Sequence, residues 1–322
     1  MSLLGIDLGG TKLALASFTP GGDIVARRTV PVSGCTGAEV GALIVAEARA
    51  LAASDGASRI DAVGAAVPGI YHADRGTVWA PNIPGWDDYP LRDELQEAFG
   101  ADVAVNVESD RAAYIAGETW RGAAAGSRNA IFLAVGTGIG AGLLVDGRIL
   151  HGHGDIAGAI GWLALDRPYR MEYVDCGHFE HHASGPGLAK CARAMLAADA
   201  GYTGLLRDAD ITTASVLEAY DARDPIAVRV VEDAIAFWGM AAANLVSLFN
   251  PEQVIFGGGV FGPATRFIPR IRDEAARWAQ PISMTQVRFV ASTLSSDAGL
   301  YGAARLAMQR GASAQPTPEV TA

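Results

Sequence analysis

A short stretch near the amino terminus has the residue types of a polyphosphate-binding turn. The segment Asp7-Leu8-Gly9-Gly10-Thr11-Lys12 lies between two apolar runs, Leu3 to Ile6 and Leu13 to Ala16, and this order predicts strand, turn and strand. Adjacent glycines let the backbone adopt positive φ and let a ligand approach the main chain closely. The N–H groups of such a turn suit phosphate, whereas the aspartate suits a divalent cation. The alternative is an ordinary glycine hairpin, and the stretch alone does not separate the two.

Two further glycine turns occur later in the chain. Gly136-Thr137-Gly138-Ile139-Gly140 stands between the apolar runs Ala130 to Val135 and Ala141 to Val145. Gly257-Gly258-Gly259 follows a predicted strand, Gln253 to Phe256. Because the second turn repeats the strand, glycine turn and strand of the first, we predict a loose internal duplication.

Neither hairpin turn fits a dinucleotide site. The Rossmann fingerprint requires a helix after its glycines, since the helix N-terminus receives the pyrophosphate. Strands are predicted after Gly10 and Gly140 instead, and no Gly-Lys-Ser/Thr Walker sequence occurs. Two hairpins that face each other across a cleft could instead hold the β- and γ-phosphates of a nucleotide, with the third glycine site beside its purine and ribose.

The predicted elements that position these turns alternate between strands and helices. Periodicity of the apolar residues predicts further strands at 24–32, 60–67, 103–107, 148–150 and 286–290. Helices are predicted at 36–53, 91–99, 110–124, 225–249, 268–279 and 299–309. The region 151–182 is predicted to be irregular and carries five of the six histidines. Residues 311–322 are small, polar and proline-containing, so a disordered tail is expected.

Composition restricts the class of protein. The chain has 322 residues, half of them apolar, which suffices for about two α/β domains. A net charge of −10 and the lack of a lysine/arginine run argue against a nucleic-acid partner. The cysteines, Cys35, Cys176 and Cys191, lack framework spacing, which indicates a reducing compartment. With no signal-peptide pattern and no apolar stretch of ~18 residues, we expect a soluble cytoplasmic protein without membrane contact.

Asp110 is the candidate general base. The predicted strand Val103 to Val107 leads to it, and a predicted helix begins there. Ser109 and Asp110 are both good helix caps, so the pattern by itself favours a capping role. A carboxylate at a helix N-terminus stays ionised at neutral pH, and it could take the proton of a substrate hydroxyl.

The ordered set of motifs resembles the ROK family of sugar kinases (repressors, open reading frames, kinases). The likeness covers about residues 3 to 308, and its motifs are Asp7-x-Gly9-Gly10-Thr11-Lys12, Val67-Pro68-Gly69, Ala80-Pro81-Asn82-x-x-Gly85-Trp86, Glu108-x-Asp110-x-Ala112, Gly136-Thr137-Gly138-Ile139-Gly140 and Gly257-Gly258-Gly259-Val260. It implies the α/β actin-like ATPase (ribonuclease H-like) fold, with ATP and sugar in a central cleft between two domains. We expect a smaller N-terminal domain, 1–117, onto which the helix at about 299–309 packs back, and a larger C-terminal domain, 118–298.

The resemblance implies ATP- and Mg²⁺-dependent phosphorylation of a sugar hydroxyl, with Asp110 as the base. Asp7 would hold Mg²⁺ through water, and Lys12 is either an added positive charge or a solvated lysine at a strand start. The phosphates and adenosine would be bound by Gly9, Gly10, Thr11, Gly136, Thr137, Gly138, Gly257, Gly258 and Gly259. The sugar would be bound by Gly69, Asn82, Ser109, Asp110, Trp162 and Glu180. Outside that context, Asn82 is a typical turn residue and Glu180 a typical solvated acid.

Two departures from the family pattern fall on the sugar pocket. The family has Asn where Ser109 stands, and it has Glu-x-x-His where this chain has Ala159 and Trp162. The second change removes charge and adds a ring that can stack on the C–H face of a sugar and donate one N–H. We therefore expect a modified hexose, such as an amino, acetamido or deoxy sugar, or another polyol, in place of glucose bound in the usual way.

A third departure removes the family's zinc module. Its Cys-x-Cys-Gly-x-x-Gly-Cys pattern is reduced to Cys176-Gly177. Structural zinc needs four ligands, so we predict no structural zinc there. The alternative is a new site made from Cys176, His178, His181 and His182, although histidines on a loop are usually polar surface.

Three functions are compatible with the sequence. The first is the sugar kinase, and the second is a non-catalytic sugar or nucleotide sensor of the same fold. The third, a transcriptional repressor, is disfavoured for two reasons. The chain is acidic, and it starts at the first phosphate loop, whereas repressors of this family carry a helix-turn-helix ahead of that loop. Polyphosphate remains open as an alternative donor. The resemblance also implies a homo-oligomer, most simply a dimer.

Overall fold

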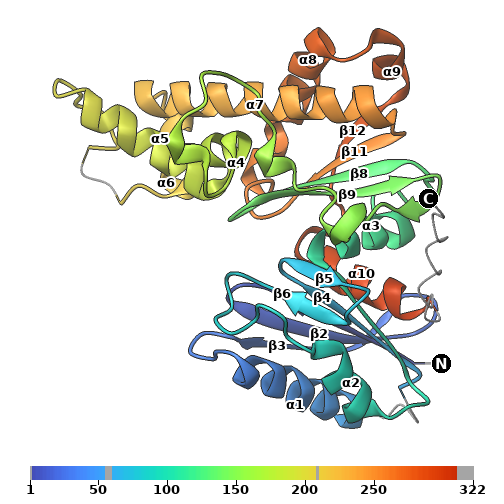
Figure 1. The fold of residues 1–322 in the computed structure, drawn as a ribbon. Coiled ribbons are helices and arrows are strands. Elements are labelled where there is room, and N and C mark those ends of the chain that lie inside the picture. Colours follow the sequence, from blue (N-terminus) through green and yellow to red (C-terminus); the bar gives the residue numbers. More distant parts are fainter. Residues whose placement is uncertain (1, 55–59, 208–209, 310–322) are drawn as a thin grey trace, which may run out of the picture. The chain divides into compact units, whose positions relative to one another are not determined.

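The computed structural model describes residues 2–54, 60–207 and 210–309, which form two compact units (Figure 1). The first unit contains the chain up to residue 125, the short segment 151–156 and the chain from 297 onward, and the second contains 126–150 and 157–296. The division at 125/126 lies C-terminal to the expected boundary at 117/118. The tail expected at 311–322 lies outside the described residues.

The first unit is built on a five-stranded sheet with the order β3-β2-β1-β4-β7. Its strands are β1 (Leu3–Leu8), β2 (Lys12–Phe18), β3 (Ile24–Pro31), β4 (Ala62–Val67) and β7 (Ala104–Ser109). β1, β2 and β3 pair antiparallel, whereas β1, β4 and β7 run parallel. Asp7 near the end of β1 and Asp110 directly after β7 therefore stand at the same edge of the sheet, where the parallel strands end.

The side chains of this sheet alternate between two cores. Leu4, Ile6 and Leu8 face α1 (Ala38–Ser54) and α2 (Leu91–Phe99), while Leu3 faces α10 (Ala298–Ala307). This is the period of two expected for a strand that is buried on both faces. Figure 1 shows α1 and α2 together on one face of the sheet.

Glycines allow α10 to approach the sheet and α3 (Asp110–Arg121) closely. A Cβ atom added to Gly64 on β4 would lie 1.9 Å from the carbonyl oxygen of Ala303, and one added to Gly302 would lie 1.8 Å from that of Ala113. No side chain fits at either place, so the backbones pack directly against one another.

A small hairpin that the sequence analysis did not predict follows β4. β5 (Ile70–His72) pairs antiparallel with β6 (Thr77–Trp79). The indole of Trp86 then stacks on Tyr89 with ring centroids 4.4 Å apart. These strands have three residues each, which is too short for a periodicity of apolar residues to reveal.

The second unit repeats the topology of the first. Its sheet has the order β10-β9-β8-β11-β12, with β8 (Ala130–Val135), β9 (Ile139–Val145), β10 (Arg148–Ile149), β11 (Gln253–Gly257) and β12 (Arg288–Ala291). β8, β9 and β10 pair antiparallel and β8, β11 and β12 run parallel. The repeated strand and turn pattern of the sequence therefore corresponds to a repeated sheet.

The helices of the second unit share one core with its sheet. They are α4 (His178–Ala183), α5 (Gly185–Ala198), α6 (Thr213–Asp221), α7 (Pro225–Phe249), α8 (Ile268–Trp278) and α9 (Pro281–Gln286). The long helix α7 has the predicted bounds, since Asp224 caps its start and Asn250, with φ +42°, ends it. Two short helices differ from the predictions: α4 lies in the region predicted to be irregular, and α9 precedes a strand that begins at 288 instead of 286. None of the helices described is long and apolar enough to cross a membrane.

Candidate active site

Asp7 is an ionisable group held at the edge of the first sheet. The α10 helix closes over it, because a Cβ atom on Gly299 would lie 2.5 Å from the Asp7 carboxyl carbon. Burial, followed by the negative charge of Asp110, raises the pKa of Asp7 to about 7, while Lys12 opposes the rise. A carboxylate in this position gains from a nearby cation.

The turn after Asp7 presents its backbone to solvent. The N–H of Gly9 donates to the carbonyl of Lys12 (2.9 Å), which closes the turn, and Gly10, Thr11 and Lys12 are exposed. A Cβ on Gly10 would lie 3.5 Å from the amide nitrogen of Asn82. The expected phosphate turn and the expected sugar ligand Asn82 are therefore neighbours within the first unit.

Asp110 is the first residue of α3, but it is not the cap of that helix. The hydroxyl of Ser109 accepts the N–H of Ala112 (3.3 Å) and so takes the capping role. The carboxylate of Asp110 accepts the N–H of Arg111 (2.7 Å) and is hydrogen-bonded to Tyr114. Burial raises the pKa of Asp110 to about 6, and Arg111 and Tyr114 oppose this rise. The pKa of this carboxyl group is therefore higher than its position at a helix N-terminus alone would suggest.

Arg111 and Tyr114 flank Asp110 and were not among the predicted site residues. A guanidinium nitrogen of Arg111 donates to the carbonyl of Gly69 (3.3 Å). Gly69 has φ +105°, and a Cβ there would lie 2.1 Å from the carbonyl oxygen of Trp79, so only glycine fits. The spacing of Tyr114, four residues after Asp110 on a helix, is the one sequence feature that could have indicated its contact.

The second and third glycine turns lie side by side in the second unit. The N–H of Gly136 donates to the carbonyl of Gly138 (2.9 Å), and a Cβ on Gly136 would lie 3.7 Å from the amide nitrogen of Gly259. Gly258 has φ +88°, and a Cβ there would lie 2.4 Å from the carbonyl oxygen of Val135. The two turns therefore form one glycine surface at the ends of β8 and β11.

Glu180 is attached to this surface and is not a freely solvated acid. Its carboxylate accepts the N–H of Ile139 (2.6 Å), and a Cβ on Gly161 would lie 2.9 Å from it. Burial raises the pKa of Glu180, and the hydrogen bond from Ile139 opposes that rise. Trp162, at the end of the short helix η2 (Ile160–Trp162), is 56% exposed. The second unit thus presents an acid and a free indole ring next to its glycine turn.

The remnant of the zinc module does not fit a tetrahedral metal site. The thiol of Cys176 donates to the carbonyl of Gly177 at 3.8 Å, and burial raises its pKa. A Cβ on Gly177 would lie 2.5 Å from the Cα of Trp162, which stands where the family has its histidine. One thiol and an indole do not supply the four nitrogen and sulfur ligands that structural zinc requires.

Comparison with known proteins shows which class this geometry belongs to. The ROK family matches residues 3–310. A glucokinase from Halalkalibacterium halodurans is 32% identical over 95% of this chain and 95% of its own length. Among solved structures, the ROK hexokinase from Thermus thermophilus is 31% identical, with a TM-score of 0.78 over 95% of this chain and 98% of that one. A ROK family glucokinase from Streptomyces griseus, in complex with glucose and AMPPNP, is 30% identical, with a TM-score of 0.74 over 96% and 100% of the two chains.

The repeated sheet and these relatives define a carbohydrate kinase with the actin-like ATPase fold. Within that class, the chain belongs to the ROK family.

Proposed function

We propose that this kinase transfers the γ-phosphoryl group of ATP to a hydroxyl of a hexose-like sugar, with Asp110 as the general base. The proposal rests mainly on the capping of α3. Ser109 caps this helix, so the Asp110 carboxylate is not needed as the cap. It stands at the same sheet edge as Asp7 and the first glycine turn. The relative from Streptomyces griseus that binds glucose and AMPPNP supports both ligand classes.

Backbone donors would bind the phosphates. The exposed turn Gly9–Thr11 supplies N–H groups from the first unit, and Gly136–Gly138 and Gly257–Gly259 supply them from the second. Lys12 is exposed and would add positive charge to the first turn.

The residues present fit a magnesium ion. Asp7 supplies the hard oxygen ligand that Mg²⁺ prefers. Burial and the negative charge of Asp110 raise its pKa, so the ionised carboxylate would be stabilised by a cation. When bound, Mg²⁺ would neutralise the charge of the phosphates. Asp7 would hold it through water, and Asp110 remains separate as the base.

Asp110 would act on the sugar hydroxyl. One carboxylate oxygen accepts the proton as the oxygen of the hydroxyl bonds to the γ-phosphorus, and the bond from that phosphorus to ADP breaks. A pKa of about 6 leaves Asp110 mostly ionised at pH 7, yet basic enough to accept a proton. Arg111 and Tyr114 fix the orientation of the carboxylate.

The proposed sugar-binding residues favour a modified hexose. Gly69, Asn82 and Ser109 belong to the first unit, and Glu180 and Trp162 belong to the second. Ala159 and Trp162 replace a charged pair of the family pattern with a methyl group and an exposed ring. Such a set of residues loses two hydrogen-bonding groups for hydroxyls and gains apolar surface for an acetamido or deoxy group.

The test is release of ADP against a panel of sugars, followed by kcat/KM for the best substrates. We expect an amino, acetamido or deoxy sugar to exceed glucose, and glucose as the clearly preferred substrate would refute the specificity. The Asp110→Asn variant should lose roughly 10²–10⁴-fold in kcat while it retains ATP binding. If no sugar supports turnover but sugars change the tryptophan fluorescence of the wild type and not that of Trp162→Ala, the chain is a sensor and the kinase mechanism fails.

A further inference from the structure

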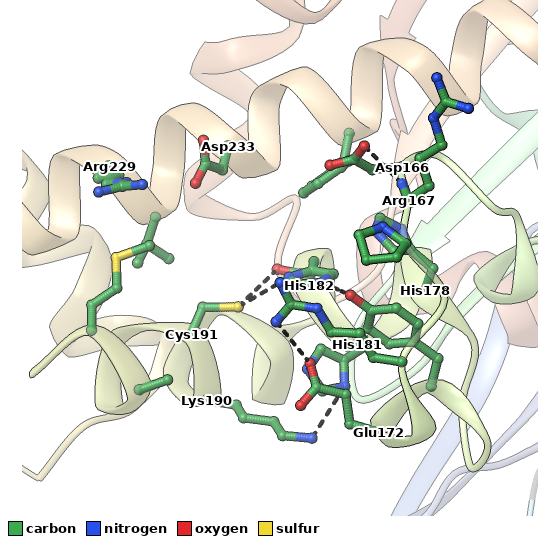
Figure 2. Close-up of a pocket in the computed structure, with 17 residues that line it drawn as sticks. Asp166, Arg167, Glu172, His178, His181, His182, Lys190, Cys191, Arg229 and Asp233 are labelled. Carbon is green, nitrogen blue, oxygen red and sulfur yellow. Dashed lines mark hydrogen bonds and ion pairs between the residues drawn. The ribbon is translucent and has the colours of Figure 1, made fainter. Parts of the chain in front are cut away.

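The second unit contains a cavity that none of the proposed catalytic residues lines. Its volume is about 510 Å³, and it lies among α4, α5, α7 and the segment 166–173 (Figure 2). Four of its lining groups are imidazole or thiol donors with an affinity for transition metals: His178, His181, His182 and Cys191.

His178 has an unsatisfied nitrogen in this cavity. The residue is only 7% exposed, and its Nδ1 atom has no hydrogen-bond partner among the described residues. A buried polar nitrogen without a partner costs about 1–3 kcal/mol, so this atom would gain from binding a ligand.

His182 follows His178 by one helical turn. The i, i+4 spacing puts both rings on one face of α4, the arrangement that helical metal sites use. Their ring centroids are 4.7 Å apart. Two imidazoles bound to one tetrahedral zinc-sized ion have centroids about 5 Å apart. The donor atoms of His178, His182 and Cys191 do not yet all lie within 4.8 Å of one another, so the His178 side chain must rotate before both rings can bind one ion.

Cys191 of α5 completes the set. Its sulfur lies 3.5 Å from Nδ1 of His182, and Figure 2 shows this contact as a dashed line. Nitrogen and sulfur ligands on one tetrahedral zinc are also separated by about 3.5 Å, given bond lengths of ~2.05 and ~2.3 Å. The pair therefore already has the spacing of two metal ligands.

The neighbouring Tyr173 favours a tautomer of His182 that can bind a metal ion. The hydroxyl of Tyr173 lies 3.1 Å from Nε2 of His182, so a proton on Nε2 leaves the lone pair of Nδ1 free.

We propose that His178, His182 and Cys191 form an open, three-ligand site for a divalent transition-metal ion, with the fourth position facing the cavity. His181 is not a member, because it contacts Lys190 (3.1 Å) and Glu172 (3.6 Å) instead. Cys176, the cysteine of the remnant zinc motif, does not line the cavity. The site is therefore built from residues other than those that the family motif supplies.

Cobalt is the probe, because its spectrum reports its ligands. Protein stripped of metal and then saturated with Mg²⁺, which occupies oxygen-rich sites, is titrated with Co²⁺. We expect one equivalent to bind, with the visible bands of four-coordinate cobalt and a near-ultraviolet thiolate-to-cobalt band. Cys191→Ser should abolish the thiolate band, and His178→Asn should weaken binding roughly tenfold or more.

Matched variants separate this site from other donors. Cys176→Ser and His181→Gln should leave the spectrum and affinity unchanged. His72, Asp74 and Asp155 converge in the first unit and could take an ion, but their nitrogen and oxygen donors would give no thiolate band. Wild-type protein without a thiolate band, or a band that survives Cys191→Ser, would overturn the proposal. Circular dichroism confirms that each variant is folded, and none of these readouts depends on kinase activity.

Discussion

Burial and the negative charge of Asp110 together raise the pKa of Asp7 to about 7. Burial also raises the pKa of Asp110, to about 6. Both residues belong to the first unit: Asp7 lies near the end of β1 and Asp110 directly follows β7, and the two strands belong to the parallel part of one sheet. The first unit therefore has two partly buried acids with raised pKa values at the sheet edge where the nucleotide and sugar ligands are proposed to bind.

The pH dependence of catalysis should report Asp110. The base must be ionised, so kcat/KM for the sugar should fall tenfold per pH unit below a pKa near 6, measured at saturating Mg²⁺ and ATP. Tyr114→Phe removes a hydrogen bond that lowers this pKa, so the acid limb should shift to higher pH. An acid limb that stays in place in Tyr114→Phe would contradict the contact.

Without ligands, Asp7 should make the protein less stable as the pH rises, whereas an ion-paired acid makes a protein more stable as the pH rises. Its pKa is higher in the folded than in the unfolded chain, so the folded state holds an extra proton, and stability falls as the pH rises from about 4 to about 7. Asp7→Asn should raise the free energy of unfolding by up to about 4 kcal/mol at pH 8 and by little at pH 4. Urea titration without Mg²⁺ or nucleotide at the two pH values checks this.

Two adjacent glycines offer a matched pair for the nucleotide site. Gly258→Ala requires alanine at φ +88° and a contact of 2.4 Å with a carbonyl oxygen, so it should cost at least about 1 kcal/mol and weaken ATP binding. Gly259→Ala meets nothing within 4 Å and should be tolerated by the fold. The two variants are compared by thermal unfolding and by titration with nucleotide. Equal losses of stability in Gly258→Ala and Gly259→Ala would contradict the steric difference.

Trp162 should influence the sugar and not the nucleotide. The ring is 56% exposed, so Trp162→Ala should leave stability within about 0.5 kcal/mol of wild type. Loss of stacking should raise KM for the preferred sugar roughly tenfold, with KM for ATP unchanged. Trp278→Ala is the control, because Trp278 is 60% exposed on α8. An unchanged KM for the sugar in Trp162→Ala would show that Trp162 does not contact the sugar.

The sequence predicted the elements that have strong local determinants. α2 and α7 have the predicted bounds. Amphipathic spacing defines α2, whereas an Asp cap at the start and an Asn-Pro sequence at the end define α7. The glycine turns are evident in the sequence because glycines between two apolar runs interrupt the strand pattern and permit a tight reversal of the chain. α4 is not predicted, since six residues with three histidines show no apolar period.

The contacts of the candidate site were harder to foresee because they depend on tertiary packing. Ser109 and Asp110 both have capping chemistry, and only the structure shows that Ser109 takes the cap. The raised pKa of Asp110 comes from burial, which the sequence does not display. The proximity of Cys191 to His182 joins two helices, and no spacing within either helix encodes it.

The glycine-mediated contact of α10 with the first sheet has a consequence for biosynthesis. Leu3, Ala14 and Phe18 are covered by Leu300, Ala304 and Ala307, which leave the ribosome almost three hundred residues later. Until then one face of the earliest strands is uncovered and available to chaperones or to aggregation. A chain truncated before residue 298 should therefore accumulate in inclusion bodies, although every strand of its first sheet has been synthesised.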